Sequence, residues 1–159
     1  MKKQICIISL MLCAAMIINA QESDFPKLTG PYLGQEPPGM IPKVFASGIV
    51  SSDDHIEMGC TWSPDGKEFY FGRSETKDIG SNWAIWVVLE KKGVWSEPEI
   101  AKFSGVYWDI APFFIRGGKS MIFFRMKMKS MRYVWDRISW NRKTRHGVSP
   151  DFYTMPTAW

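Results

Sequence analysis

Cysteine is scarce in this sequence of 159 residues, and two of its three cysteines, Cys6 and Cys13, lie in the apolar N-terminal segment. Cys60 is the only cysteine beyond that segment, which excludes an intramolecular disulfide framework for the rest of the chain. No histidine or basic residue adjoins Cys60 to activate its thiol. We therefore expect a fold held by its apolar core, with Cys60 as a small buried residue.

The sequence also lacks the common catalytic signatures. It has no Gly-x-Ser-x-Gly elbow, no His-Glu-x-x-His helix and no phosphate-binding loop. The acid–base candidates are Asp109, Glu97, Glu99 and His146, and no spacing among them requires a paired site. These absences predict a protein that is not an enzyme, with no catalytic residue and no cofactor-binding residue.

One short segment concentrates side chains that are able to bind a metal ion. On a strand, Asp53, His55 and Glu57 would share one face, and their carboxylate and imidazole groups suit a divalent cation. The same residues equally suit a polar loop that leads into the first repeat. We predict the loop and no metal-binding residue, and we leave weak ion binding by these three side chains open.

Residues 1–20 have the layout of a secretory signal peptide. Two lysines precede an apolar run over residues 5–18, and polarity begins abruptly after Ala20. The run is short of the ~20 residues that a membrane-spanning helix needs. We expect cleavage after Ala20, no stable membrane span, and export to the periplasm or the extracellular space. A retained anchor is the alternative, because Ile18 replaces the small residue usual two places before Ala20.

A strong excess of charge is missing as well. Lys2 and Lys3 lie in the predicted signal peptide, so 18 of the 20 basic residues remain against 16 acidic ones, which gives no argument for nucleic acid. Arg125, Lys127 and Lys129 alternate with methionines and would share one face of a strand. That face is either a site for a polyanion or a solvated strand surface. Export disfavours nucleic acid as the partner.

The chain beyond the signal peptide divides into a lead-in and a β region. Residues 21–42 are rich in proline and glycine, which excludes a helix or a central strand and predicts an extended lead-in. Residues 43–50 are the first plausible strand. Residues 43–159 are expected to hold repeated β units, because no segment outside the signal peptide shows helical periodicity.

Residues 61–71 contain the clearest turn signal. Pro64 presets the backbone for the second turn position, and Gly66 accepts the positive φ that closes a hairpin. Shifting the sequence by 52 residues aligns this hairpin with another, so that Arg73 meets Arg125. One repeat then holds four short strands in about fifty residues, the size of a propeller blade. The predicted turn residues of the two repeats are Ser63, Pro64, Asp65, Gly66 and Lys67 in the first and Gly117 and Gly118 in the second.

The first repeat resembles the WD40-like (PD40, TolB-type) β-propeller family. Residues 62–71, Trp-Ser-Pro-Asp-Gly-Lys-Glu-Phe-Tyr-Phe, are similar to the family's Phe-Ser-Pro-Asp-Gly-Lys-x-Ile-Tyr-Phe core. Residues 84–88 resemble its Asp-Ile-Trp strand, with Ala84 in place of the aspartate, and residues 95–98 resemble its Trp-Ser-x-Pro strand. The match covers the chain from residue 28 to about residue 125 and decays beyond it.

This resemblance implies an all-β fold. We predict a partial β-propeller with about two four-stranded antiparallel blades plus a degenerate third, after an N-terminal signal helix. Propellers usually need four to eight blades, because each blade packs its faces against neighbours. We therefore expect a truncated chain, or self-association that covers the open blade faces.

The resemblance also implies a function. We expect a non-catalytic exported module of the periplasm or cell envelope that binds a protein, a peptide or a glycan. The alternative is a propeller fragment of a larger enzyme, such as a serine peptidase whose catalytic domain is missing. The eight tryptophans could form a platform for sugar stacking, but in propellers most such rings fill the space between blades, so we expect core packing.

Overall fold

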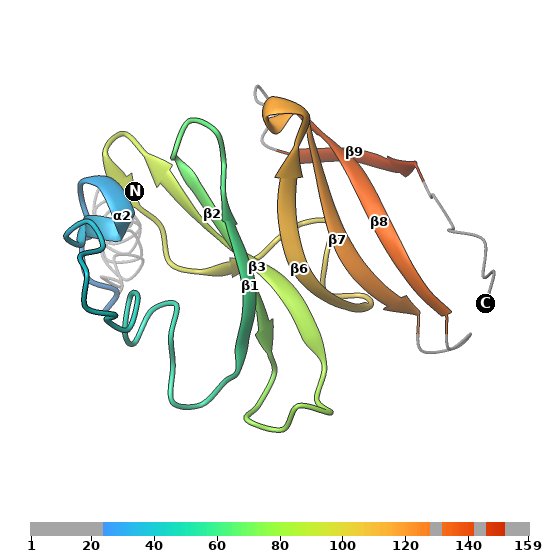
Figure 1. The fold of residues 1–159 in the computed structure, drawn as a ribbon, viewed down its shortest axis with the longest axis horizontal. Helices are drawn as coiled ribbons and strands as arrows, with labels where there is room; N and C mark the ends of the chain where they lie inside the picture. Colours follow the sequence, from blue (N-terminus) through green and yellow to red (C-terminus); the bar gives the residue numbers. More distant parts are fainter. Residues whose placement is uncertain (1–23, 128–131, 142–145, 152–159) are drawn as a thin grey trace, which may run out of the picture.

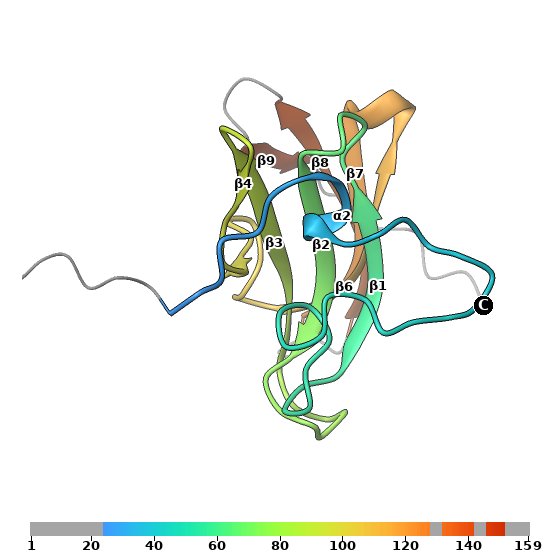
Figure 2. The ribbon, with the colours of Figure 1, turned by 90° about the vertical axis from the view of Figure 1, so that its left-hand side faces the viewer.

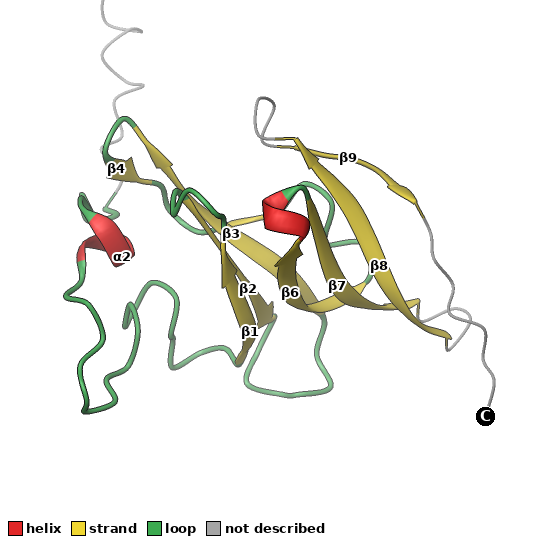
Figure 3. Cartoon of the chain, turned by 45° about the horizontal axis from the view of Figure 1, so that its top comes forward, coloured by secondary structure: helices red, strands yellow, loops and turns green. Residues whose placement is uncertain are grey.

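A computed structural model describes residues 24–127, 132–141 and 146–151, so the predicted signal peptide lies outside the described residues. The described chain forms two separate antiparallel sheets, one after the other in sequence (Figure 1). Helix is confined to α2 (Pro31–Gly34) and a 3-10 turn (Arg116–Gly118) (Figure 3). The all-β prediction is confirmed, and neither sheet closes on itself.

The first sheet has the strand order β1-β2-β3-β4, and the short strand β5 pairs with another part of β3. Pro98 lies between β4 and β5 and has no backbone N–H to donate, so two short strands flank the position of the strand expected from the Trp-Ser-x-Pro motif of residues 95–98. The strands of this sheet are β1 (Glu57–Trp62), β2 (Glu68–Ser74), β3 (Trp83–Lys91), β4 (Val94–Trp95) and β5 (Glu99–Ile100).

The second sheet has the order β6-β7-β8-β9, and all of its neighbours pair antiparallel. Its last two strands lie beyond residue 125, where the match to the family motifs decays. The strands are β6 (Trp108–Ile115), β7 (Ser120–Lys127), β8 (Arg132–Asn141) and β9 (His146–Asp151).

The 52-residue offset of the sequence is also an offset of the structure. Strand β2 begins at Glu68 and β7 begins at Ser120, and both are second in their sheets. Strands β1 and β6 each carry an irregularity in register, and Gly59 and Ala111 within these irregularities have positive φ angles of 65° and 54°. No third sheet occurs in the described ranges, so the predicted degenerate third unit has no counterpart there.

The turn between β1 and β2 is closed by side chains as well as by the backbone. The Ser63 hydroxyl donates to Asp65 Oδ1 at 2.6 Å and accepts from the amide of Glu68 at 3.0 Å. The amide of Gly66, with φ of 68°, donates to Ser63 O at 2.8 Å. Lys67 Nζ lies 3.1 Å from Glu90 Oε2 on the neighbouring strand. These residues fix the length and direction of the hairpin.

The equivalent turn of the second sheet packs against the first turn. A Cβ atom built on Gly118 would lie 2.1 Å from Pro64 Cγ and 2.7 Å from Pro64 Cδ. Gly118 also has a φ of 83°, which glycine adopts without strain. Gly117 has a φ of 62°, but a Cβ there would meet nothing within 4 Å. The two predicted turn glycines therefore have different roles, since only Gly118 is required for the contact between the turns.

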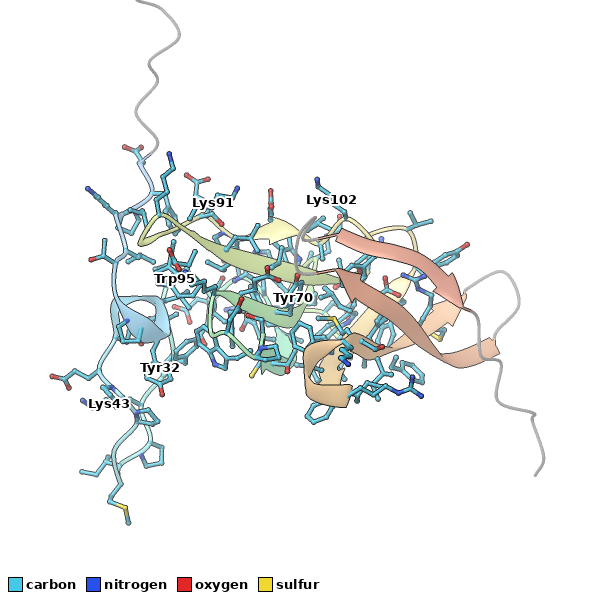
Figure 4. All side chains as sticks on the ribbon, turned by 90° about the horizontal axis from the view of Figure 1, so that it is seen from above. Tyr32, Lys43, Tyr70, Lys91, Trp95 and Lys102 are labelled. Atoms are coloured by element: carbon cyan, nitrogen blue, oxygen red, sulfur yellow. The ribbon has the colours of Figure 1, made fainter. Side chains whose placement is uncertain are left out.

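The core lies on both faces of the first sheet. Because successive strand residues point to opposite faces, Phe69 and Phe71 of β2 face the lead-in while Tyr70 faces the second sheet. Figure 2 shows the lead-in crossing in front of the first sheet, and Figure 4 shows Tyr70 near the centre of the molecule. The lead-in face is completed by Leu33, Ala46, Val50, Val88 and Trp95.

The second cluster fills the space between the two sheets. Ile85 and Val87 of β3 and Met121 and Phe123 of β7 are buried there, and the Tyr70 ring makes an edge contact with Phe114 at 5.8 Å. Strand β6 lies against β1, β2 and β3, so the first strand of the second sheet lies nearest to the first sheet. This packing places the residues just before β6 beside the ends of β2 and β3.

The segment that follows the lead-in differs from its prediction. The strand expected over residues 43–50 is absent, and this segment instead forms turns in which Ala46 has a φ of 45° and its carbonyl accepts from Ile49 and Val50. Burial of Ala46 and Val50 against the sheet face replaces strand pairing. In α2, Tyr32 and Leu33 have positive φ, so α2 is a left-handed turn. No helix among the described residues is long and apolar enough to cross a membrane.

Candidate functional site

A cleft of about 840 Å³ lies where the ends of β2 and β3 meet the segment leading into β6. It is formed by both repeats, because one wall belongs to the first sheet and the other begins the second. Clefts with an apolar lining and a few polar groups are the usual form of ligand sites. The aromatic lining consists of Trp83, Trp86, Tyr107 and Trp108.

Arg73 provides the positive charge in the first wall, and its Nε and Nη2 atoms are both engaged. It contacts Glu57 Oε1 at 3.3 Å through Nε, and Nη2 donates to the carbonyls of Ile49 and Val50, each at 2.6 Å. Its Cζ lies 5.2 Å from the centre of the Trp86 ring, within the range of a cation–π contact. Burial lowers the pKa of Arg73, and the carboxylate of Glu57 opposes this effect.

The rim of the cleft carries polar groups that are positioned by local hydrogen bonds. His55 Nδ1 lies 3.1 Å from the carbonyl of Ser74, so Nδ1 is the protonated nitrogen of that contact, because a carbonyl only accepts. The Asn82 side chain donates through Nδ2 to Glu75 Oε2 at 3.2 Å. The rim therefore presents an imidazole, an amide and a carboxylate close to the aromatic lining.

The second wall is built on a buried ion pair. Arg125 Nε lies 2.7 Å from Asp109 Oδ1, Nη2 lies 2.9 Å from Oδ2, and Asp109 is completely buried. The Ser104 hydroxyl donates to Asp109 Oδ2 at 2.6 Å and accepts from the amide of Ile85 at 2.9 Å, which ties the pair to the first sheet. Arg125 Cζ lies 4.9 Å from the centre of the Tyr107 ring. The pair thus supports the aromatic residue in this wall.

The acid–arginine pair is repeated at the 52-residue offset. Glu57 and Arg73 in the first sheet correspond to Asp109 and Arg125 in the second. Arg73 also donates to two backbone carbonyls of the preceding segment, and Arg125 donates to the carbonyl of Phe103. The sequence comparison aligned the arginines, whereas the acids differ in length. The pair in the second sheet has two close contacts and deeper burial, and the pair in the first sheet borders the cleft.

The residues predicted as a possible ion site do not gather. Asp53 and Asp54 lie in an exposed turn before β1, so the segment is not the strand that would place alternate side chains on one face. His55 contacts Ser74, and Glu57 pairs with Arg73. In the part of the chain that the structure describes, no three Asp, Glu, His or Cys side chains form a group that could hold a metal ion.

Of the three basic side chains in the alternating stretch, only that of Arg125 lies in the described part of the chain. Arg125 is buried in the Asp109 pair, so the prediction that it shares a solvated strand surface is wrong. The side chains of Lys127 and Lys129 lie outside the described part. Among the tryptophans, Trp83 and Trp95 are buried in the core, while Trp86 and Trp108 are half-buried and line the cleft.

Cys60 is exposed, so the prediction that it is buried is wrong. It follows the irregularity at Gly59, where β1 shifts its register against β2. Partial burial of the thiol nevertheless raises its pKa above the ordinary value. A raised pKa reduces the thiolate fraction at neutral pH and makes the sulfur a poor nucleophile.

Sequence reasoning named His55 but missed Tyr107 and Asn82. These residues come from three segments that lie apart in the chain and meet only after β6 packs on the first sheet. The one available signal was the offset itself, which aligns the ring of His55 with the ring of Tyr107. Comparison of the chain with protein-family models, curated proteins and solved structures finds no match.

Proposed function

We propose that this protein is a non-catalytic, exported binding module of the WD40-like propeller type, and that it takes a protein, peptide or glycan ligand in the cleft between its two repeats. The observation that carries the proposal is the cleft itself, in which aromatic rings and hydrogen-bonding groups converge from both repeats.

The propeller assignment is supported by the order of the elements. Two antiparallel sheets follow one another at a 52-residue offset, and the first strand of the second sheet packs on the first sheet. Consecutive blades of a propeller pack in this way, as repeats that contact their neighbours. The sequence motifs of residues 62–71 and 95–98 support the same assignment.

A binding role is favoured over catalysis by the state of the cleft's ionisable groups. Arg73 is held by Glu57 and two carbonyls, and Glu75 accepts from Asn82. A general acid–base pair requires two titratable groups aimed at one reacting atom. The engaged groups instead suit a role in shaping the cleft and orienting a ligand.

The cleft is tested by changing Val106, an exposed apolar residue of its lining. We expect the purified chain to retain ligands from an array of peptides and of neutral and anionic glycans. Val106→Asp should weaken the affinity for the most tightly bound ligand of the array about tenfold, roughly 1.4 kcal/mol, because it places a charge in the apolar part of the lining. Val106 is 82% exposed, so the substitution leaves the core intact.

Ile79→Asp is the matched control, since Ile79 is also an exposed apolar residue, at 64%, and does not line the cleft. We expect its affinity to stay within about twofold of the parent. Equal losses in the two variants, or an array without any retained ligand, would contradict the proposed function.

A further inference from the structure

We propose that the ligand of this cleft is a neutral saccharide, with one pyranose ring stacked on Tyr107. This inference rests on the proposed function of the cleft as a binding site and adds the chemistry of what it binds. Three properties of the lining carry it: the balance of charge, the contact of Tyr107 with Arg125 and the exposure of the apolar residues Ile100 and Val106.

The charge of the cleft disfavours an anionic ligand. Among the described lining residues, Arg73 is the only lysine or arginine. Its guanidinium is already bound by Glu57 and by the carbonyls of Ile49 and Val50. Recognition of a phosphate, sulfate or carboxylate relies on a cation that is free to form charge-assisted hydrogen bonds. The carboxylate of Glu75 at the rim would further repel an anion.

Tyr107 is a preorganised aromatic surface. Arg125 covers one face of its ring at 4.9 Å and is itself only 5% exposed, while Tyr107 is 39% exposed. Tyr107 also lines the cleft, so a part of the residue that Arg125 does not cover faces the cleft. A ring held in place by a buried partner loses little further freedom when a ligand binds.

The polar rim suits hydroxyl groups. A pyranose has an apolar C–H face, which stacks on an aromatic ring, and a circle of hydroxyls that both donate and accept hydrogen bonds. Glu75 and Asn82 offer a carboxylate and an amide, and His55 offers an imidazole, all from the same cleft. Together these groups supply the acceptors and donors that a neutral polyol needs, beside a flat ring.

The apolar part of the cleft is less suited to a protein or peptide. Ile100 and Val106 are 47% and 82% exposed, so they form an exposed apolar surface and no enclosed pocket. Peptide recognition concentrates its energy in side chains that enter desolvated pockets. A sugar ring can lie flat on an exposed apolar surface and does not need such a pocket. This difference favours the saccharide over the peptide.

The test measures binding of cellohexaose, xylohexaose, mannohexaose and maltohexaose to the purified chain by isothermal titration calorimetry. We expect at least one of them to bind, and we expect Tyr107→Ala to weaken it about tenfold. Tyr107→Phe keeps the ring and should stay within about twofold. Tyr32→Ala is the control, because Tyr32 is an equally exposed aromatic residue, at 40%, in α2.

The outcomes separate this inference from the proposed function. If none of the four oligosaccharides binds, or if Tyr107→Ala and Tyr32→Ala behave alike, the saccharide inference is wrong. If a peptide or an anionic glycan such as heparin binds and Val106→Asp weakens it, the cleft is a binding site for another ligand class, and only the inference fails. If no ligand class responds to Val106→Asp, the proposed function fails as well.

Discussion

Replacing Asp109 with asparagine is expected to lower the free energy of unfolding by about 3–5 kcal/mol, because it removes the charge of one partner of a buried ion pair and leaves the charge of the other. Asp109 is fully buried and accepts from Arg125 Nε and Nη2 and from the Ser104 hydroxyl. The asparagine keeps the shape of the side chain but removes its charge and turns one acceptor into a donor. Arg125 would remain buried and would lose the charge of the Asp109 carboxylate. Urea denaturation followed by tryptophan fluorescence measures the loss.

The matched control is Glu57→Gln, the same change at the corresponding position of the first repeat. Glu57 meets Arg73 through one contact of 3.3 Å, and its side chain is 21% exposed. Arg73 also keeps its two carbonyl partners in this variant. We expect a loss of about 1 kcal/mol, as for a partly exposed pair. Equal losses in the two variants would contradict a special role for the Asp109 pair in joining the sheets.

Replacing Gly118 with alanine is expected to lower the free energy of unfolding by about 3 kcal/mol, from backbone strain and overpacking together. The new Cβ would lie 2.1 Å from Pro64 Cγ, and the residue has a φ of 83°. Relief requires the two turns to move apart, which disturbs the packing of β6 on the first sheet. Thermal and urea unfolding of the variant measure the effect.

Gly117→Ala separates the two causes of that loss. Gly117 has a φ of 62°, but nothing lies within 4 Å of its Cβ position, so only strain of about 1 kcal/mol is expected. Adding Pro64→Ala to Gly118→Ala should recover most of the remaining difference, about 2 kcal/mol, as a coupling between contacting residues. Strictly additive effects of Pro64→Ala and Gly118→Ala would show that the turns do not touch.

The strands could be predicted from the sequence because their signals are local. The turn of residues 63–67, the aromatic run in β2 and the apolar run in β3 each follow from neighbouring residue types. The 52-residue offset then located the second hairpin, in which β7 begins 52 residues after β2. The expected strand over residues 43–50 was wrong because Ala46 adopts a positive φ and packs on the sheet face. Such tertiary packing cannot be predicted from the strand propensities of the residues in the segment.

The cleft could not be predicted from the sequence because it depends on how the sheets pack. The sequence gives no sign that Tyr107 differs from any other loop residue, and only the structure shows that Arg125 packs against its ring. In the sequence, Arg125 belongs to a basic stretch, which gives no sign that it is buried. Its burial becomes clear only from the structure, in which Asp109 of β6 lies opposite Arg125 of β7. The sequence supplied the positions of the two arginines through the offset, and the packing decided what each one contacts.

The central claim, that the cleft between the repeats is the binding site, is tested most directly by hydrogen–deuterium exchange with and without the strongest ligand of the array. We predict slower amide exchange in residues 73–75, 82–86 and 104–108, which come from both walls, and unchanged exchange in residues 24–50. Slower exchange confined to residues 24–50, or to one wall of the cleft alone, would contradict the claim.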